Sequence, residues 1–496
     1  MNVDTANTSE LIAKIDKGEL VTISFIYPDE KTMKYINSVF SKVLSKIDLV
    51  YLLDTIITIQ REIIINAAKA NAKRVFFKKL ELDIHDADSY QKGIDQFKNE
   101  IVGDLDLVKA DLQQSNLMIK LSIQKTAKGI VLTVTNNSAI LPEELERIQL
   151  RMTRAREYND FSEAYDEVYD NTEGAGLGIV LVTLLLKNSG IGAESYTIKS
   201  DGEITKCDLT IPFELKPSEI TSNIKNQILE LVQGLPTFPE NIIQLQRLCG
   251  DPQASINEIS DRIMLDPSLT SDVLKLSNSA GFITGKRIEK VSEAVVKIGL
   301  KNLNSILTAS SARHILDTRF SKFEQVWSHC NKTAFYSRAI ATKFKFSKIL
   351  ENVFLAGLLH DLGKIVLLST NLDLTNWIAD IVDNRKIRTS TIMEEISIGI
   401  SHPAIGELIS NKWSFPEYLT ETIRHHHSPT RAKKQYRDQA QVTYLANMLC
   451  GVESRKYDYS YIEETTLDHF GMKSPEELVK IHEELRNQFD IHSKTL

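Results

Sequence analysis

Six of the eleven histidines in this chain fall between residues 329 and 427, in a pattern suited to metal binding. They form a lone His329, the pair His360-Asp361, a lone His402 and the run 425–427. Imidazole and carboxylate groups bind catalytic divalent metals at neutral pH. Lys364 follows shortly after and could act as a point charge for phosphate. The spacing predicts a buried phosphate site with one or two metal ions.

The order of these residues resembles that of the HD-type phosphohydrolases. By this resemblance the metal ligands would be His329, His360, Asp361, His402, His426 and His427. HD enzymes complete the shell with an aspartate on a late helix, and Asn447 stands at the matching position. A neutral amide binds a hard dication less well than a carboxylate does. Two alternatives therefore stay open: a site that binds metal, and a vestigial site in which the histidines form a hydrogen-bonded core.

A second signal lies upstream of the histidines, in four short motifs. They read LPTFP at 235–239, IMLDPSLT at 263–270, LSNSA at 276–280 and AVVKIGL at 294–300. In this order and spacing they resemble the HDOD family, the HD-related output domain of bacterial signalling proteins. Most of its members lack the full metal shell and are regarded as regulatory modules. The resemblance therefore implies an output module that binds a partner protein.

The second half also reads as helical without reference to any family. Apolar residues recur at steps of three and four between 256 and 264, which is one face of a helix. The residues at 266–268 are expected to stop this helix and cap the next one. We expect an all-α bundle over 227–432 and a helical extension of it over 433–496.

Two signals organise the first half of the chain. Glu62 and Asn66 lie four residues apart, hence on one face of a helix expected at 61–72. A carboxylate that orients water beside an amide that holds Mg²⁺ is what ATP hydrolysis needs. The second signal is a glycine turn before an apolar helix, where backbone amides can approach phosphates. Its glycines are Gly174, Gly176 and Gly178.

Together these signals resemble the ATP-binding fold of gyrase, mismatch-repair and heat-shock ATPases and sensor histidine kinases, the GHKL group. The resemblance implies an α/β sandwich over 1–215, with an insertion near 81–117 and a mobile lid near 143–172. The residues themselves indicate a β-like stretch at 74–77 and strands near 118–124 and 129–135. Glu62 would be the general base. Asn66 would hold Mg²⁺, and the full set of residues binding ATP would be Asn66, Lys69, Asn136, Gly174, Gly176 and Gly178.

Two features depart from an active kinase. The first glycine box of the group normally supplies an aspartate that reads adenine, whereas this chain has Asn136 and no glycines there. The amide oxygen of Asn136 can still accept a hydrogen bond, so we expect ATP binding with weak turnover at most. The first histidine of the chain is His85, in a polar loop after the helix. Histidine autophosphorylation is therefore not expected.

Composition sets the outer bounds. At 496 residues the chain should form two or three domains, and its net charge of −7 gives no basic surface for nucleic acid. The four cysteines have no zinc-binding spacing, which fits a reducing cytosol. We find no signal peptide and no apolar run of about 18 residues, so a cytoplasmic protein without a membrane span is expected.

These observations predict a bacterial, cytoplasmic signal-transduction regulator. A nucleotide-binding domain over 1–215 would be joined by a linker at 216–226 to a non-catalytic HDOD module. The alternative is a metal-dependent phosphodiesterase or phosphohydrolase that acts on a nucleotide and is regulated by ATP. A protein-directed kinase or ATPase is disfavoured by Asn136. The signal, the partner and the oligomeric state, a homodimer included, stay open.

Overall fold

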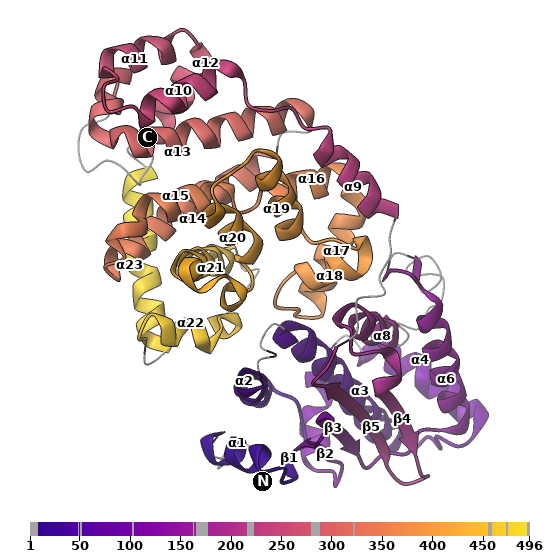
Figure 1. The fold of residues 1–496 in the computed structure, drawn as a ribbon. Coiled ribbons are helices and arrows are strands. Elements are labelled where there is room, and N and C mark those ends of the chain that lie inside the picture. Colours follow the sequence, from indigo (N-terminus) through magenta and orange to yellow (C-terminus); the bar gives the residue numbers. More distant parts are fainter. Residues whose placement is uncertain are drawn as a thin grey trace. The chain divides into compact units, whose positions relative to one another are not determined.

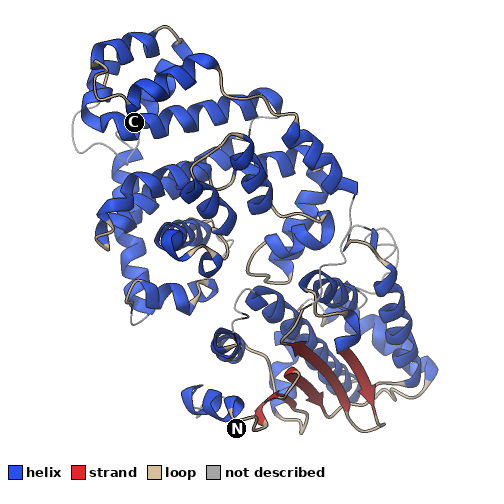
Figure 2. Ribbon diagram, viewed as in Figure 1, coloured by secondary structure: helices blue, strands red, loops and turns tan. Residues whose placement is uncertain are grey.

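The computed structural model describes residues 8–493 except 48, 50–51, 102–103, 162, 165–176, 216–222, 279–287, 321–322, 455–458 and 473–474. The chain divides into two compact units. The first consists of Met1–Ser222 with Glu395–Gly399, and the second of Asn223–Glu394 with Ile400–Leu496. Figure 1 shows a strand-containing first unit and a second unit built from helices, which Figure 2 colours by type.

The first unit is built on a five-stranded antiparallel sheet of order β1-β2-β3-β5-β4. The strands are β1 Val21–Phe25, β2 Ile119–Lys125, β3 Gly129–Asn136, β4 Tyr196–Ser200 and β5 Thr205–Pro212. Leu132 in β3 lies opposite Ile123 in β2 and Leu209 in β5. Alternate residues of β2 are buried, as expected of a sheet with one face against a core. The strands expected near 118–124 and 129–135 are thus confirmed.

Helix α3, Leu53–Lys79, lies against this sheet through contacts with β2 and β3. It contains the helix expected at 61–72, but it also runs through 74–77, where a β-like stretch was expected. That expectation was wrong because Phe76 and Phe77 pack in a helical cluster with Phe97 and Leu112. Tertiary packing here overrides the strand preference of aromatic and β-branched residues.

The remaining helices of the first unit surround α3. They are α1 Thr8–Asp16, α2 Glu30–Lys46, α4 Ala87–Glu100, α5 Lys109–Gln113, α6 Pro142–Glu157 and α8 Leu177–Ser189. The expected insertion at 81–117 forms α4, the short helix η2 (Leu105–Val108) and α5, and all three contact α3. The first part of the expected lid, 143–157, belongs to α6, which packs on α8. Most of the rest of that segment lies outside the described residues.

The described residues of the second unit form helices and loops only. The first group is α9 Asn223–Gln233, α10 Glu240–Gly250, α11 Ile256–Met264, α12 Pro267–Ser277 and α13 Val291–Arg319. The helix predicted from the apolar spacing at 256–264 is confirmed as α11. The cap of α12 is Asp266, whose carboxylate accepts from the backbone N–H groups of Ser268 and Leu269, both at 3.0 Å. Of the linker expected at 216–226, residues 223–226 belong to α9, which buries Ile228 and Val232, and residues 216–222 lie outside the described residues.

The second group of helices forms the centre of this unit and its C-terminal extension. They are α14 Glu324–Lys343, α15 Leu350–Leu359, α16 Leu362–Thr370, α17 Leu372–Asn384, α18 Thr391–Ile398, α19 His402–Lys412, α20 Glu417–His425, α21 Arg437–Glu453, α22 Glu464–His469 and α23 Pro475–Ser493. Helix α14 packs on both α15 and α21, and α16 packs on α19. Glu453 on α21 accepts hydrogen bonds from Lys332 and Tyr336 on α14 and, at 3.0 Å, from His482 on α23. These contacts join the extension to the centre of the bundle.

One described helical run, Ser347–Thr370, is long and apolar enough to cross a membrane by length and composition alone. However, 78% of its most apolar window is buried inside the fold. It comprises the short helix η4 (Ser347–Ile349), α15 and α16, and it carries His360 and Asp361. A buried core helix passes the same test, and burial in the bundle accounts for this composition.

Glycines let the helices of this centre approach one another closely. A Cβ at Gly357 of α15 would lie 2.5 Å from Ala334 Cα of α14. A Cβ at Gly363 of α16 would overlap the backbone carbonyl oxygen of His402, where α19 begins. The absence of a side chain at Gly363 therefore sets the distance between the pair His360-Asp361 and His402.

We predict that Gly363→Ala lowers the free energy of unfolding by about 1–3 kcal/mol, because the new methyl group overpacks a backbone contact. The matched control is Gly250→Ala at the end of α10, where a Cβ would meet no atom within 4 Å. That variant should stay within roughly 1 kcal/mol of the wild type. Denaturant unfolding of both proteins measures the difference, and equal stabilities would contradict the close approach of α16 and α19.

Candidate functional sites

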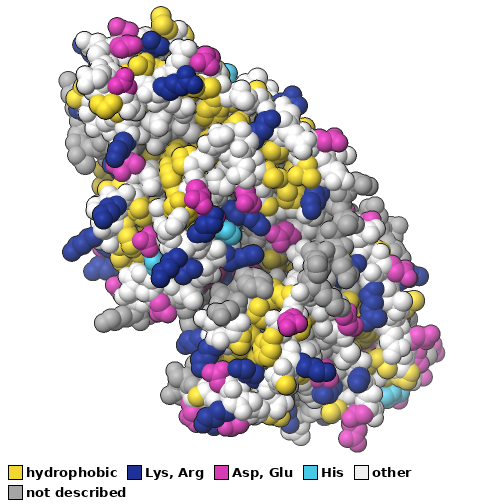
Figure 3. All heavy atoms as spheres, in the orientation of Figure 1, with side chains coloured by type: hydrophobic (Ala, Val, Ile, Leu, Met, Phe, Trp, Pro, Cys, Tyr) yellow, Lys and Arg dark blue, Asp and Glu magenta, His cyan; other side chains and the backbone are white. Residues whose placement is uncertain are grey.

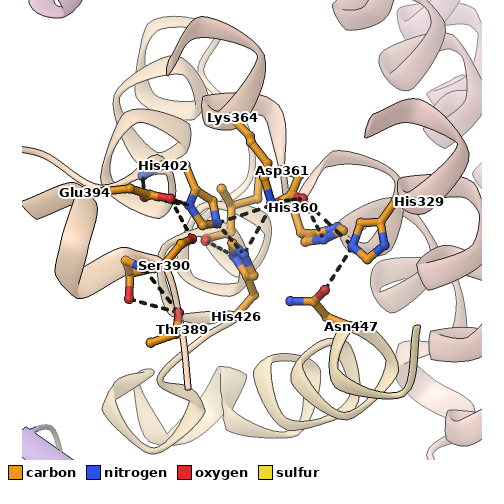
Figure 4. A network of polar contacts seen from close by, with 12 residues as sticks. His329, His360, Asp361, Lys364, Thr389, Ser390, Glu394, His402, His426 and Asn447 are labelled. Atoms are coloured by element: carbon orange, nitrogen blue, oxygen red, sulfur yellow. Dashed lines mark hydrogen bonds and ion pairs between the residues drawn. The ribbon is translucent and has the colours of Figure 1, made fainter. Parts of the chain in front are cut away.

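The predicted metal ligands come together at the centre of the second unit (Figure 4). They lie on different helices: His329 within α14, the pair His360-Asp361 between α15 and α16, and His402 at the start of α19. His426 follows the end of α20. Residues almost a hundred positions apart in the sequence thus surround one carboxylate, that of Asp361, which is 2% exposed.

One oxygen of Asp361 faces two histidines. Its Oδ1 lies 3.3 Å from His402 Nε2 and 3.6 Å from His426 Nε2. The two Nε2 atoms are themselves 3.3 Å apart. His427 lies beside this pair, with its ring centroid 4.3 Å from that of His426 and 5.1 Å from that of His402. Potential ligand atoms of the three histidines all lie within 4.8 Å of one another.

The other oxygen of Asp361 faces a different set. Its Oδ2 lies 3.5 Å from Lys364 Nζ, 3.6 Å from His360 Nε2 and 3.9 Å from His329 Nε2. His329, His360 and Asp361 form a second group whose ligand atoms lie within 4.8 Å of one another. Lys364, predicted to hold a phosphate group, instead pairs with Asp361 while its side chain stays 31% exposed. It could therefore contact both the carboxylate and an incoming anion.

Backbone carbonyl groups fix the ring orientation of two histidines. His360 Nδ1 lies 2.9 Å from the carbonyl oxygen of Gly357, and His426 Nδ1 lies 2.7 Å from that of Ile423. Since a carbonyl oxygen only accepts, each Nδ1 carries the proton and donates it. The lone pair of a neutral ring is then on Nε2, which points into the cluster. This arrangement is typical of histidines that bind metal ions.

Glu394 on α18 fixes the ring orientation of His402, and this residue was not predicted from the sequence. His402 Nδ1 lies 2.8 Å from Glu394 Oε2, and the backbone N–H of His402 donates to the same oxygen at 2.8 Å. Ser390 donates to Glu394 Oε1 at 2.7 Å. Glu394 is 2% exposed. In the sequence, Glu394 is only a glutamate eight residues before a candidate ligand, and this spacing becomes informative once the fold is known.

The charge states of the cluster suit cation binding. Burial holds the pKa of His360 well below its usual value, so its ring is neutral. Burial alone would raise the pKa of Asp361, but the charge of Lys364 and the neighbouring histidines hold it well below its usual range. Burial opposes protonation of His402, yet Glu394 and Asp361 raise its pKa to about 9. Metal ions bind carboxylates and neutral imidazoles and displace the proton that His402 would otherwise carry.

The inward atoms of the cluster are satisfied only in part. His402 donates through Nδ1 to Glu394, and its Nε2 lies 3.3 Å from Asp361 Oδ1. Because the pKa of His402 is raised to about 9, this Nε2 carries a proton when no cation is bound, and a cation takes the place of that proton. Within the described part of the chain, His360 Nε2 is buried and forms no hydrogen bond. A vestigial core would be expected to pair this atom, whereas a metal site needs its lone pair.

Asn447 lies where the closing carboxylate of the HD enzymes was expected to stand. It is buried on α21, and its Oδ1 is 2.9 Å from His329 Nε2. The side chain therefore faces the cluster from the C-terminal extension, as Figure 4 shows. On the outer surface over α20 and α21, basic and acidic side chains are intermingled, so the region is not an apolar patch (Figure 3).

The first unit contains a cavity of about 270 Å³ between α3, α4, α6 and the sheet. Three of the residues predicted to bind nucleotide line it: Asn66, Lys69 and Asn136. Asn136 donates through Nδ2 to Asn71 Oδ1 at 3.2 Å. Glu62, the expected base, is buried one turn before Asn66 but is not among the lining residues.

The predicted glycine turn is only partly described. Gly178 is buried inside α8, next to Ile179, which lines the cavity. Gly174 and Gly176 lie outside the described residues. The sequence analysis missed the positive charge of this cavity, because its basic residues come from three separate helices. They are Lys69 and Lys73 on α3, Lys98 on α4, and Arg147 and Arg151 on α6.

Comparison with known families identifies part of the chain. Residues 235–429 match the family described as HDOD domain. These residues are an HDOD domain. An uncharacterized protein of Treponema pallidum (strain Nichols) is 28% identical over 456 residues, covering 92% of this chain and 89% of that protein.

Two crystal structures resemble part of the chain. One is an HDOD domain protein of unknown function from Geobacter sulfurreducens, which is 22% identical to this chain. The match covers 54% of this chain and 97% of the Geobacter chain, with a TM-score of 0.42. The other is a protein from Shewanella amazonensis SB2B, provisionally named a phosphohydrolase, which is 22% identical to this chain. The match covers 54% of this chain and 98% of the Shewanella chain, with a TM-score of 0.41. Both TM-scores are below 0.5, so these likenesses carry no weight for function.

The HDOD domain contains every histidine of the cluster and Glu394, since all of them lie within 235–429. Asn447 lies beyond the matched residues, on α21. The cluster is thus completed by a helix outside the family match. The HDOD match does not extend to the first unit, whose likeness to the GHKL group stays a prediction.

We predict that Glu394→Gln weakens binding of a divalent cation at the cluster by roughly 10–100-fold, because an uncharged amide holds and polarises His402 less well. The control is Glu407→Gln on α19, the helix that His402 begins, where the carboxylate is 41% exposed and pairs with Arg424. Calorimetric titration with Mn²⁺ measures both affinities. Equal weakening in the two variants, or none in Glu394→Gln, would contradict the role assigned to Glu394.

Proposed function

We propose that this protein is a bacterial, cytoplasmic signal-transduction regulator whose HDOD domain binds a divalent transition-metal ion. The observation that carries the proposal is the pairing of His402 Nε2 with Asp361 Oδ1 at 3.3 Å, while Glu394 holds the other ring nitrogen. Without a cation, the second proton of His402, whose pKa is about 9, lies between these two atoms in a buried site. A divalent cation would take the place of that proton, and both atoms would bind it.

The donor set fits such an ion. Imidazole nitrogens together with one carboxylate suit iron, manganese or zinc, whereas magnesium and calcium prefer a shell of oxygens. When bound, such an ion can polarise a phosphoryl oxygen or lower the pKa of a water molecule. The chain's own contribution is to hold the rings through Gly357, Ile423 and Glu394 and to keep Asp361 ionised.

A second candidate function is hydrolysis of a phosphate ester of a nucleotide. It is favoured by Asp361, whose two oxygens face two different donor groups, and by Lys364, which lies 3.5 Å from Oδ2 and remains partly exposed. Asn447 counts against it, since an amide stands where HD hydrolases use a carboxylate. We therefore favour a regulatory module that binds metal over a hydrolase.

We expect the purified protein to contain manganese, iron or zinc near one equivalent per chain and to lose it in His426→Ala. The control, His85→Ala, changes an exposed histidine of the first unit and should keep the metal. Elemental analysis by mass spectrometry measures the content. A wild-type protein without metal would contradict the proposed metal centre, and hydrolysis of a cyclic or linear nucleotide that is lost in Asp361→Ala would establish the second candidate.

For the first unit, we propose that the cavity binds ATP with Mg²⁺ in a GHKL-like manner. Its apolar lining, including Ile63, Ile148 and Ile179, suits a base, and its basic residues suit phosphate groups. Asn66 lies in the lining, where it could hold Mg²⁺. Nucleotide occupancy would set the state of the regulator, and the HDOD domain would pass that state to a partner protein.

We predict that ATP binds the full-length protein and that Arg151→Ala weakens it roughly tenfold, because a charge-assisted hydrogen bond contributes about 1.5–3 kcal/mol. Asn66→Ala should remove the Mg²⁺-dependent part of the affinity. Arg154→Ala is the control, since Arg154 lies on the same helix but is exposed. Calorimetry with ATP, with and without Mg²⁺, tests this. No heat with the wild-type protein at millimolar ATP would contradict the proposal.

A further inference from the structure

The cluster has two halves that share Asp361, and they differ in charge. One half contains His402, His426 and His427 beside Oδ1 of Asp361. The other contains His329 and His360 beside Oδ2. Each half brings enough donor atoms together to bind a cation. Which half does so depends on the groups around it.

The half with His402 has an anionic surrounding. Glu394 is buried behind His402 and accepts from its Nδ1 at 2.8 Å. His426 is held by the carbonyl oxygen of Ile423 at 2.7 Å. In this half the carboxylates of Asp361 and Glu394 therefore lie on opposite sides of one imidazole. Two negative charges next to three imidazoles favour a dication.

In the half with His329, a ligand nitrogen is already engaged. His329 Nε2 lies 2.9 Å from Asn447 Oδ1. If the ring carries its proton on Nε2, it donates to the amide oxygen. If the amide is turned, its NH₂ group donates to the ring instead. In either case the hydrogen bond occupies the nitrogen that would bind the cation, and the amide brings no charge to replace it.

Lys364 places its positive charge closest to the same half. Its Nζ lies 3.5 Å from Oδ2 of Asp361, the oxygen nearest to His329 and His360. That oxygen is thus already paired with a cationic side chain, and a dication beside it would be repelled by the ammonium group. The charge of Lys364 also acts on His427, but the Asp361 oxygen nearest to His402 and His426 is Oδ1.

We infer that the chain binds a single divalent cation in the half formed by His402, His426, His427 and Asp361 Oδ1, and that Asn447 keeps the half with His329 empty. This inference rests on the proposed metal centre and assigns its position and stoichiometry. It also assigns Asn447 a role: this residue limits the centre to one cation, although the centre has two halves that could each bind one.

The test counts bound Mn²⁺ by equilibrium dialysis of the full-length protein and of three variants. The wild type should bind one ion. His427→Ala should weaken its binding by at least tenfold, whereas His329→Ala should leave it within about threefold. Asn447→Asp restores a carboxylate of nearly the same size and should raise the number of bound ions to two. Circular dichroism and thermal unfolding confirm that each variant is folded.

The outcomes separate this inference from the proposed function. A wild type that binds no Mn²⁺ contradicts the metal centre as a whole, and the inference with it. One ion that is lost in His329→Ala but kept in His427→Ala leaves the metal centre standing and overturns its position. Two ions in the wild type, or one ion in Asn447→Asp, overturn the role of Asn447. Should His329→Ala fail to fold, His329→Gln takes its place.

Discussion

The second unit is organised around one buried carboxylate. Taking the Asp361 carboxylate out of water is costly unless charges and hydrogen bonds compensate it. Compensation comes from Lys364 on the next helical turn and from histidines on other helices. Because these partners belong to α14, α15, α19 and the end of α20, the carboxylate constrains the mutual placement of four helices. Stability and site geometry are thus set by the same interaction.

Backbone groups as well as side chains hold the histidines in place around Asp361. The carbonyl oxygens of Gly357 and Ile423 come from the last turns of α15 and α20, where they lack partners within the helix. By accepting from His360 and His426 they satisfy these helix ends and fix the direction of both rings. Each histidine can adopt this position because it is the first residue after a helix that ends two residues beyond the carbonyl group it uses. The same hydrogen bonds therefore cap the two helix ends and orient the two histidine rings.

Much of the metal cluster was readable from the sequence, whereas its support was not. The order of the histidines and the aspartate resembles that of HD-type phosphohydrolases, and this resemblance named all six candidate ligands, which the structure brings together. Glu394 could not be found in this way, because a glutamate in a helical stretch is usually exposed and only the fold shows it beside His402. Apart from Lys69, the basic residues of the N-terminal cavity were missed for the same reason. Lys98 and Arg151 belong to segments interpreted as an insertion and a lid, and only the packing brings them to one cavity.

Local propensity failed where long-range packing decided the outcome. The residues 74–77 have strand-forming side chains, yet they continue α3, because Phe76 and Phe77 gain a core with Phe97 from the expected insertion. Asn447 illustrates the opposite case, in which chemistry and not packing distinguishes the residue from the expected carboxylate. An amide and a carboxylate have nearly the same shape, so either could stand on this helix in contact with His329. The difference is one negative charge, and in the proposed metal centre that charge would decide how many cations are bound.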